Sequence, residues 1–281
     1  MASPPRAVAE ISEVLGSNPI DLKRLGEVAQ RHPAAASQII KVCNTSTFSL
    51  SCPVSSLEQA TVSLGAALLR AVTLAWGLIE QVGRCLPAAQ AQLFWQHSLT
   101  TALVSERIAA WTGYPLTEAY LAGFLHDIGR VPLLMVSGPP EAAAGTGASR
   151  CGESTAAEAN DFGIDHCELG RQIGMGWGFP EPFIEVFALH HASSAEANAP
   201  ELLNIVGTAE SLCSRRVPAF GGAAVNPRYG ANRHELAVGS AADPDLAAGA
   251  SLVEILELEF LQTAQSLKLG DSVSFAQSFA G

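Results

Sequence analysis

The segment Ala119-Tyr-Leu-Ala-Gly-Phe-Leu-His-Asp-Ile-Gly-Arg130 decides how the rest of the chain is interpreted. Up to Leu125 it is apolar on nearly every side, which is typical of a helix buried in the middle of a domain. We expect His126 and Asp127 in its last turn and Gly129 at the position that ends the helix. A buried carboxylate is costly unless it is paired, hydrogen-bonded or bound to a metal. The His-Asp pair therefore marks either a metal-binding cavity or two satisfied polar groups of the core.

The composition indicates a globular protein with a sizeable core. The chain has 281 residues, of which 48% are hydrophobic and 15% are charged. This length suits one large domain or two smaller ones. The formal net charge of −11 disfavours binding to a phosphate backbone. We therefore expect no direct contact with nucleic acid.

The sequence carries no recognisable signal for export or membrane insertion. Met1 to Arg6 does not open a basic region followed by an apolar stretch, and no apolar run of transmembrane length is free of interruption. The six cysteines are scattered and form no Cys-x-x-Cys pair, which is typical of reduced thiols. We expect a cytoplasmic protein that does not enter a membrane.

Residues 1–86 are predicted to form an N-terminal helical lobe. Strand signals are almost absent from the chain, while helix-period apolar patterns and capping residues recur, so the predicted fold class is all-α. Asp21 is placed to cap one of the helices, and Ser56 to Gln59 is typical of a helix start. The predicted helices of the lobe follow Pro5 and cover 22–31, 34–43, a stretch ending at Leu64, and the run from Gly65 to Ile79 or beyond.

Residues 87–215 are predicted to form a second helical block, which begins at Leu86-Pro87. A segment rich in Gly, Pro, Ala and Ser from Ser137 to Ser154 predicts a surface loop within it. Residues 216–281 are expected to contain an irregular excursion to residue 243 and a closing helix over 245–268. Besides the segment already quoted, the predicted helices of the block cover about 91–112, 156–162, 166–177, 181–192 and 200–215.

The polar residues of the second block fall on apolar helix faces or at helix starts. His97 lies on the inner stripe of the helix over 91–112. Asp165 is placed to cap a helix that carries His166 in its first turn. The His190-His191 doublet adjoins the apolar face of its helix, and Glu210 falls on the buried-looking stripe of the last helix in the block. A charge on such a stripe must find a partner.

Together these side chains form a metal-compatible set drawn from five helices. Each alone is more often a core polar group than a ligand, but so many on different helices favour one shared cluster. Imidazoles and carboxylates without thiolates suit one or two divalent ions of Fe, Mn, Zn or Mg. Two metals sharing a bridging carboxylate could activate water and clamp a phosphate. The candidate metal ligands are His97, His126, Asp127, His166, His190, His191 and Glu210.

These residues carry a resemblance to a known superfamily. The order of His97, the His126-Asp127 pair and Glu210 resembles the HD superfamily of metal-dependent phosphohydrolases. The added histidines resemble the extended set of HD-GYP cyclic-di-GMP phosphodiesterases. Over about residues 4–213 the chain most resembles the HDOD domain, the HD-related output domain of bacterial signalling proteins. The motifs that carry this last resemblance are Asn18-Pro-Ile-Asp-Leu22, Ala34–Asn44, Val54-Ser-Ser-Leu-Glu-Gln-Ala60, Leu64-Gly65, Trp95-Gln-His-Ser98, Gly123-Phe-Leu-His-Asp-Ile-Gly129, Trp177-Gly-Phe-Pro180 and His190-His191.

Three departures separate the chain from the HD-GYP pattern. Arg130 stands where that pattern has Lys, and Ala192-Ser-Ser-Ala-Glu-Ala197 stands where Gly-Tyr-Pro is expected. The last acidic ligand of the superfamily is Asp, whereas this chain has Glu210, which is longer by one methylene. Cyclic-di-GMP hydrolysis loses support for these reasons. The HDOD resemblance implies a regulatory or scaffolding role instead.

Three functional hypotheses follow. The first is a signalling output module that binds a protein partner of unknown identity and keeps the cluster as a structural or vestigial metal site. The resemblance then implies His97, His126, Asp127 and Glu210 as inner ligands, while the remaining histidines hold a second ion or orient the first. The second is a metal-dependent phosphohydrolase acting on a nucleotide or cyclic dinucleotide, with Asp127 and Arg130 as its catalytic residues. The third is a sensor that binds a small ligand in the same pocket.

Overall fold

A computed structural model describes residues 3–45, 48, 50–137, 155–191 and 200–214. All regular secondary structure in these ranges is helical, which confirms the predicted all-α class. None of the described helices combines the length and the apolar character needed to span a bilayer. The predicted loop after Ser137, the excursion over 216–243 and the predicted helix over 245–268 lie outside the described residues.

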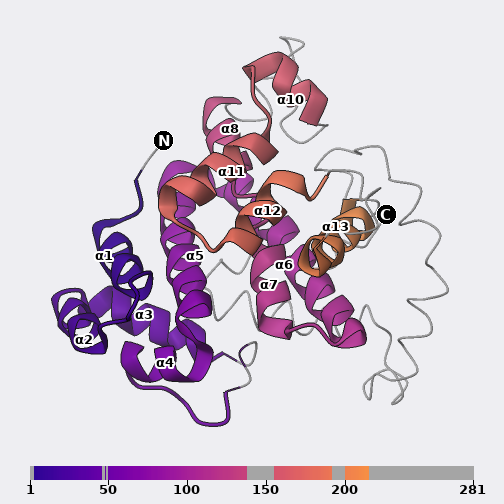
Figure 1. Ribbon diagram of the computed structural model, residues 1–281. Helices are drawn as coiled ribbons and strands as arrows, with labels where there is room; N and C mark the ends of the chain where they lie inside the picture. The colour runs from indigo at the N-terminus through magenta and orange to yellow at the C-terminus, as the bar shows by residue number, and fades with distance from the viewer. Residues whose placement is uncertain (1–2, 46–47, 49, 138–154, 192–199, 215–281) are drawn as a thin grey trace.

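The first helices form a compact group at one side of the molecule (Figure 1). Asp21 accepts a hydrogen bond from the Arg24 N–H at 2.9 Å, and Ser56 accepts one from the Gln59 N–H at 3.2 Å. Both caps satisfy backbone donors of a first helical turn, so these helix starts were predictable from sequence. The helices of this group are α1 (Arg6–Leu15), α2 (Leu22–Arg31), α3 (Pro33–Cys43) and α4 (Leu57–Leu64).

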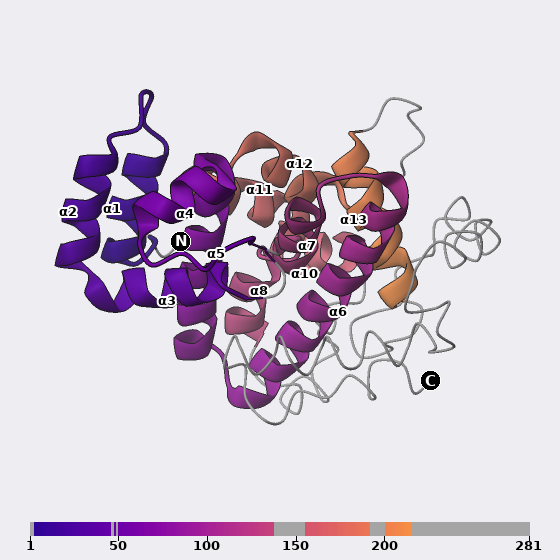
Figure 2. The same ribbon diagram turned by 90° about the horizontal axis from the view of Figure 1, so that it is seen from below.

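The middle of the molecule consists of three longer helices and the elements that pack on them. α5, α6 and α7 run through the centre, α13 lies on the side away from α1–α4, and α11 and α12 lie between these two sides (Figures 1 and 2). The bounds are α5 (Ala66–Cys85), α6 (Ala88–Thr112), α7 (Leu116–Leu125), α8 (Arg130–Ser137), α10 (Thr155–Phe162), α11 (His166–Trp177), α12 (Glu181–Leu189) and α13 (Glu201–Ser214).

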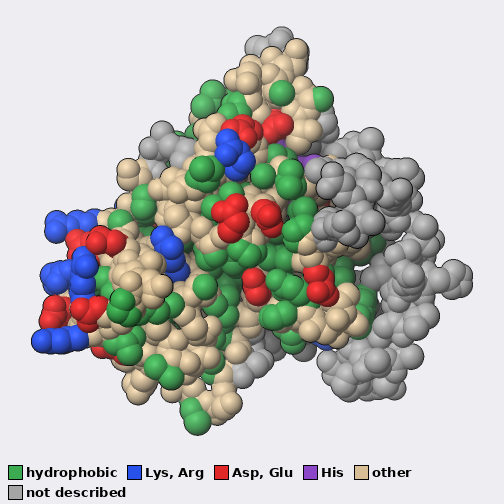
Figure 3. Space-filling model, in the orientation of Figure 1, with side chains coloured by type: hydrophobic (Ala, Val, Ile, Leu, Met, Phe, Trp, Pro, Cys, Tyr) green, Lys and Arg blue, Asp and Glu red, His purple; other side chains and the backbone are tan. Residues whose placement is uncertain are grey.

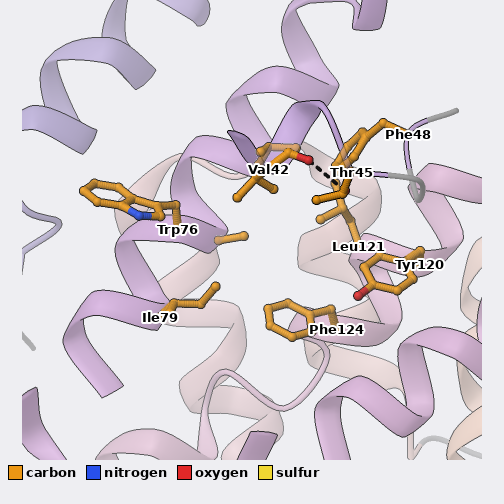
Figure 4. Close-up of a pocket in the computed structure, with 10 residues that line it drawn as sticks. Val42, Thr45, Phe48, Trp76, Ile79, Tyr120, Leu121 and Phe124 are labelled. Atoms are coloured by element: carbon orange, nitrogen blue, oxygen red, sulfur yellow. Dashed lines mark hydrogen bonds between the residues drawn. The ribbon is translucent and has the colours of Figure 1, made fainter. Parts of the chain in front are cut away.

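One apolar cluster extends from α1 to α13 and crosses the predicted boundary at residue 86. Where α3 and α5 approach α7, side chains such as Trp76 and Phe124 surround a small cavity (Figure 4). Its volume of about 30 Å³ is close to the space of a single water. The contact between the first helices and α7 is therefore nearly close-packed. The division into a lobe and a core remains a prediction.

Gly123 fixes how closely α7 approaches α6. A Cβ atom at this position would lie 2.6 Å from the Ser105 hydroxyl and 2.9 Å from the Thr101 carbonyl oxygen. These separations are shorter than a carbon atom tolerates, so only glycine allows the two helices to pack this closely. Since α6 carries His97 and α7 leads into His126, the same contact sets the spacing of two candidate ligands.

We expect Gly123→Ala to destabilise the protein by about 1–3 kcal/mol, because the added methyl must push α7 away from α6. Gly83→Ala in α5 is the matched control, since its Cβ would meet nothing within 4 Å. The free energy of unfolding of that control should rise by about 0.5–1 kcal/mol, because alanine has a higher helix propensity than glycine. Chemical denaturation of both variants measures the difference. Equal effects of the two substitutions would contradict the close approach at Gly123.

Candidate metal centre

The structure brings all seven predicted ligand residues together in the core, from α6, the α7–α8 turn, α11, the end of α12, and α13. Arg130, the predicted catalytic cation, lies beside them. Six of the seven candidate ligands have exposed fractions of 4% or less, and Asp127 is fully buried. Ionisable side chains are rarely buried so completely without a partner or a metal. The exposed fractions are 2% for His97, 1% for His126, 0% for Asp127, 1% for His166, 4% for His190 and 3% for Glu210.

Two helix ends differ from the sequence prediction. α7 ends at Leu125, so His126 caps it and Asp127 lies in the turn that leads to α8, outside the helix. α12 ends at Leu189, before the His190-His191 doublet that was predicted to be helical. In both places the histidine follows the last helical residue. The physical reason is that a ring placed just after the helix can donate a hydrogen bond to a carbonyl of the last helical turn, that of Gly123 for His126 and that of Val186 for His190.

The rings of His126 and His190 are held by the same contact. The Nδ1 atom of His126 donates to the Gly123 carbonyl at 2.7 Å, and that of His190 donates to the Val186 carbonyl at 2.9 Å. A carbonyl oxygen can only accept, so the proton of each neutral ring lies on Nδ1. Each Nε2 atom then presents a lone pair to the centre of the cluster. This is the usual arrangement of metal-binding histidines.

Glu158 supplies the equivalent contact for His166, and sequence reasoning missed it. Its Oε2 atom lies 2.5 Å from His166 Nδ1 and also accepts the His166 backbone N–H at 2.9 Å. Glu158 is 2% exposed. As a carboxylate it can only accept, so His166 also presents the Nε2 lone pair to the centre.

Gly129 has a different role from the predicted helix end. Its φ is not positive, unlike that of the C-capping Gly178 of α11. A Cβ at Gly129 would lie 1.9 Å from the His166 carbonyl oxygen and 2.5 Å from the Gly170 nitrogen. The glycine therefore lets the turn after Asp127 contact the backbone of α11 directly. This contact sets the distance between Asp127 and His166.

The carboxylate of Asp127 divides the cluster into two groups. In the first group, Oδ2 lies 3.3 Å from His97 Nε2 and 3.6 Å from His126 Nε2. The Glu210 carboxylate completes this group, at 3.0 Å and 3.2 Å from the same two nitrogens. The two Nε2 atoms are themselves 3.2 Å apart.

In the second group, Oδ1 of Asp127 lies 3.4 Å from His166 Nε2 and 3.3 Å from His190 Nε2. Those two nitrogens are 3.3 Å apart. His191 joins the group through the rings of His166 and His190, at centroid distances of 5.0 Å and 4.3 Å. Because both Nδ1 protons are committed elsewhere, these atoms face one another as acceptors without a proton between them.

Both groups fit a divalent cation. Ligands about 2.1 Å from one ion lie roughly 3.0 Å apart in octahedral and 3.4 Å apart in tetrahedral geometry. The observed ligand–ligand separations of 3.0–3.6 Å lie within about 0.2 Å of these two values or between them. Among the described residues, none donates a hydrogen bond of acceptable geometry to either oxygen of Asp127. A cation between the acceptors would satisfy them.

The charge balance of the core also favours a bound cation. The buried acids of the described residues are Asp127, Glu158 and Glu210, and the one buried Lys or Arg among them is Arg130. Its Nε atom lies 2.7 Å from Asp127 Oδ2. Three carboxylates beside one guanidinium leave a deficit of positive charge that is costly in a dry interior. Divalent ions, or protons on histidines, would remove it.

The pKa shifts follow from burial and from these neighbours. Burial raises the pKa of Asp127, but the nearby Arg130 and His126 outweigh it and hold the pKa well below the usual range. For His97, burial lowers the pKa, yet the carboxylates of Glu210 and Asp127 raise it to about 9. Burial and the charge of Arg130 hold the pKa of His166 well below its ordinary value.

Burial and neighbouring groups also shift the pKa values of three more side chains. The pKa of Glu210 is raised by burial, but His97 and His126 outweigh this and hold it well below the ordinary value. Burial raises the pKa of Glu158, against the opposing hydrogen bond from the backbone of His166. Burial also lowers the pKa of His191 to about 2. At neutral pH His166 and His191 therefore present neutral imidazoles, which is the protonation state that a metal ligand needs.

An all-helical core that encloses one His-Asp pair and a set of convergent histidines defines a protein of the HD type. The sequence profile of the HDOD domain matches residues 1–193 of the chain. The chain therefore belongs to the HDOD domain family, which confirms the resemblance drawn from its motifs. The match covers every candidate ligand except Glu210.

Comparisons with individual proteins agree with this fold. A crystal structure of an HDOD domain protein of unknown function from Geobacter sulfurreducens gives a TM-score of 0.57 at 20% identity, and covers 100% of this chain and 84% of that chain. The structure of a provisionally assigned phosphohydrolase from Shewanella amazonensis SB2B also gives 0.57 at 20% identity, with coverages of 98% and 95%. At such identities the likeness shows the fold alone.

A curated relative extends well beyond the matched region. An uncharacterised protein of Treponema pallidum (strain Nichols) is 21% identical over 194 aligned residues, and the match covers 66% of this chain. The chain spans only 37% of the length of that relative. The match is therefore to one part of a longer protein.

We expect Gly129→Ala to destabilise the protein by about 1–3 kcal/mol or more, because the new methyl meets backbone atoms that no side-chain rotation can move. Gly174→Ala in α11 is the matched control, since its Cβ would be 3.0 Å from the Phe187 ring, a side chain that can shift. Its loss of stability in chemical denaturation should be clearly smaller. A Gly129→Ala protein as stable as the wild type would show that the turn and α11 are not in direct contact.

Proposed function

We propose that the chain is a regulatory output module of signalling proteins that acts by binding a protein partner and holds divalent metal in its core. Membership of the HDOD family supports the signalling role. The free, scattered thiols of the described residues suit a reducing compartment, so we place this role in the cytoplasm. The burial of the cluster is the observation that favours binding over catalysis.

The cluster is enclosed to a degree that suits a structural site. The six deepest candidate ligands are at most 4% exposed. In the face drawn in Figure 3, histidine surface is visible only as a small spot. Described residues form two apolar cavities, one between α3, α5 and α7 and the other between α5, α8 and α11. None of the seven candidate ligands lines either of these two cavities. A hydrolytic site needs an open position for substrate, whereas a structural metal site is closed.

The metal-holding residues are those of the two groups. His97, His126, Asp127 and Glu210 would hold one ion, and Asp127, His166, His190 and His191 the other. A bound ion would supply positive charge that stabilises the buried carboxylates and ties five parts of the chain together. Arg130 keeps the shared carboxylate in place from the side of α8.

A protein partner suits the surface better than nucleic acid does. The basic side chains at the α1–α2 end in Figure 3 lie among acidic ones. Arg6 and Arg31 pair with Glu10 at 2.7 Å and 3.1 Å, and Arg24 pairs with Glu13 at 3.0 Å. Pairing with carboxylates weakens attraction to phosphates, and the chain as a whole carries a net charge of −11.

A second candidate function is metal-dependent phosphohydrolysis. It is favoured by the completeness of the cluster, since all seven predicted side chains converge and none is turned away. The Shewanella amazonensis neighbour carries a provisional assignment of this kind. In that case Asp127 would orient the ions and Arg130 would steady phosphate charge. The two functions predict different behaviour of the same variants.

We expect protein purified without chelator to contain close to two divalent ions per chain. His97→Gln should retain about one ion through the second group, and His190→Gln about one through the first. Asp127→Asn should retain none, because both groups share its carboxylate. Elemental analysis measures the content, with the exposed Asp161→Asn as the control that keeps both ions. Loss of all metal in both histidine variants would contradict two separable groups.

We expect no hydrolysis of a generic phosphodiester or of a cyclic dinucleotide by the Mn²⁺-loaded protein above the rate of Asp127→Asn. The reason is that six of the seven candidate ligands are at most 4% exposed, which suits a closed site. Product release followed by chromatography measures the rates. Turnover that disappears in Asp127→Asn and persists in Asp161→Asn would assign the chain as a phosphohydrolase and reject the binding role as its main activity.

A further inference from the structure

We propose that Glu158 is a positioning residue that fixes the ring and the tautomer of His166, and that α10 thereby controls the second group without acting on the first. The inference rests on the proposed metal-holding role of the cluster. It concerns a residue outside the set of seven ligands predicted from sequence.

The contacts of Glu158 support this role. Its Oε2 atom meets both the Nδ1 atom of His166, at 2.5 Å, and the backbone N–H of the same residue, at 2.9 Å. One carboxylate oxygen is thus bonded to both the ring and the backbone of His166, which fixes the position of the ring and of its proton. With the proton on Nδ1, the Nε2 lone pair faces Asp127 Oδ1 at 3.4 Å. Removing the acceptor would let the proton move to Nε2 and block that ligand position.

Glu158 is also the means by which α10 reaches the core. It is the one residue of α10 that is fully buried; the rest of this helix is partly or largely exposed. α10 lies at the edge of the molecule, beyond α8 and α11 (Figure 1). A helix whose one deeply buried side chain is a carboxylate gains little from apolar burial. The bond to His166 is therefore the polar contact that links α10 to the cluster.

His126 and His190 differ from His166 in the group that orients the imidazole ring. Each of them bonds to a carbonyl of its own helix end, four residues back or fewer, so its orientation follows from local structure. His166 begins α11 and has no preceding carbonyl in that helix to bond. Its ring depends on a side chain from another element, eight residues earlier. The second group is consequently the one that a change at α10 can alter.

The test separates the contact of Glu158 with the His166 ring from a general loss of capping at the start of α11. We would compare Glu158→Ala and the shape-preserving Glu158→Gln with Asp165→Ala, which removes the other cap of α11 at the Glu168 N–H but leaves the His166 ring untouched. In metal-free protein, ¹⁵N spectra of labelled histidines report which ring nitrogen carries the proton. Wild type and Asp165→Ala should show His166 protonated at Nδ1. Glu158→Ala should lose this signature, and Glu158→Gln should keep it, because the amide oxygen still accepts.

Zn²⁺ affinity supplies the second readout, by competition with a chromophoric chelator in the His97→Gln background. There Glu158→Ala should weaken binding by roughly 10- to 100-fold, whereas Asp165→Ala should leave it unchanged. An unchanged His166 tautomer in Glu158→Ala, or equal affinity losses in Glu158→Ala and Asp165→Ala, would overturn the positioning role. If the wild type binds no Zn²⁺, the proposed metal function fails, and the tautomer comparison alone decides the role of Glu158.

Discussion

The buried carboxylate of Asp127 is the constraint on which the rest of the structure depends. A fully enclosed negative charge costs several kcal/mol unless other groups compensate for it. Here Arg130 compensates on one side and His97 of α6, whose pKa is raised to about 9, on another. His166 of α11 and His190 at the end of α12 face Asp127 with Nε2 lone pairs, so a cation between them would complete the compensation. The helices that supply these groups must converge on one point. Their arrangement around Asp127 thus follows from electrostatics as much as from apolar packing.

Convergence is achieved with helix ends and close backbone contacts. Where α7 and α12 end, the rings of His126 and His190 donate to carbonyls of the last helical turn, so the same bond stabilises the helix end and orients the candidate ligand. Gly123 and Gly129 then allow α6 and α11 to approach within distances that a Cβ would forbid. Stability and site geometry therefore rest on the same contacts.

The parts that were predictable from sequence are those that local chemistry determines. Capping side chains predicted three helix starts, and all three accept the expected backbone hydrogen bond: Asp21, Ser56 and Asp165. Glu158 gave no such signal, because it lies in a short helix without an apolar stripe and its partner is in another element. The role of Gly129 was misread for a similar reason: its requirement comes from α11, which the local sequence does not reveal.

Metal in such a cluster can serve the fold without serving catalysis. Binding free energy for ions held by groups that meet only in the native state is also folding free energy. The enclosed site lies between α6, α7, α11, α12 and α13, so ions there would strengthen the contact of several helices at once. Rigidity of this kind lowers the entropic cost of any binding event at the surface, because a preorganised surface loses less freedom. The same set of buried side chains can thus stabilise the fold whether or not the protein turns over a substrate.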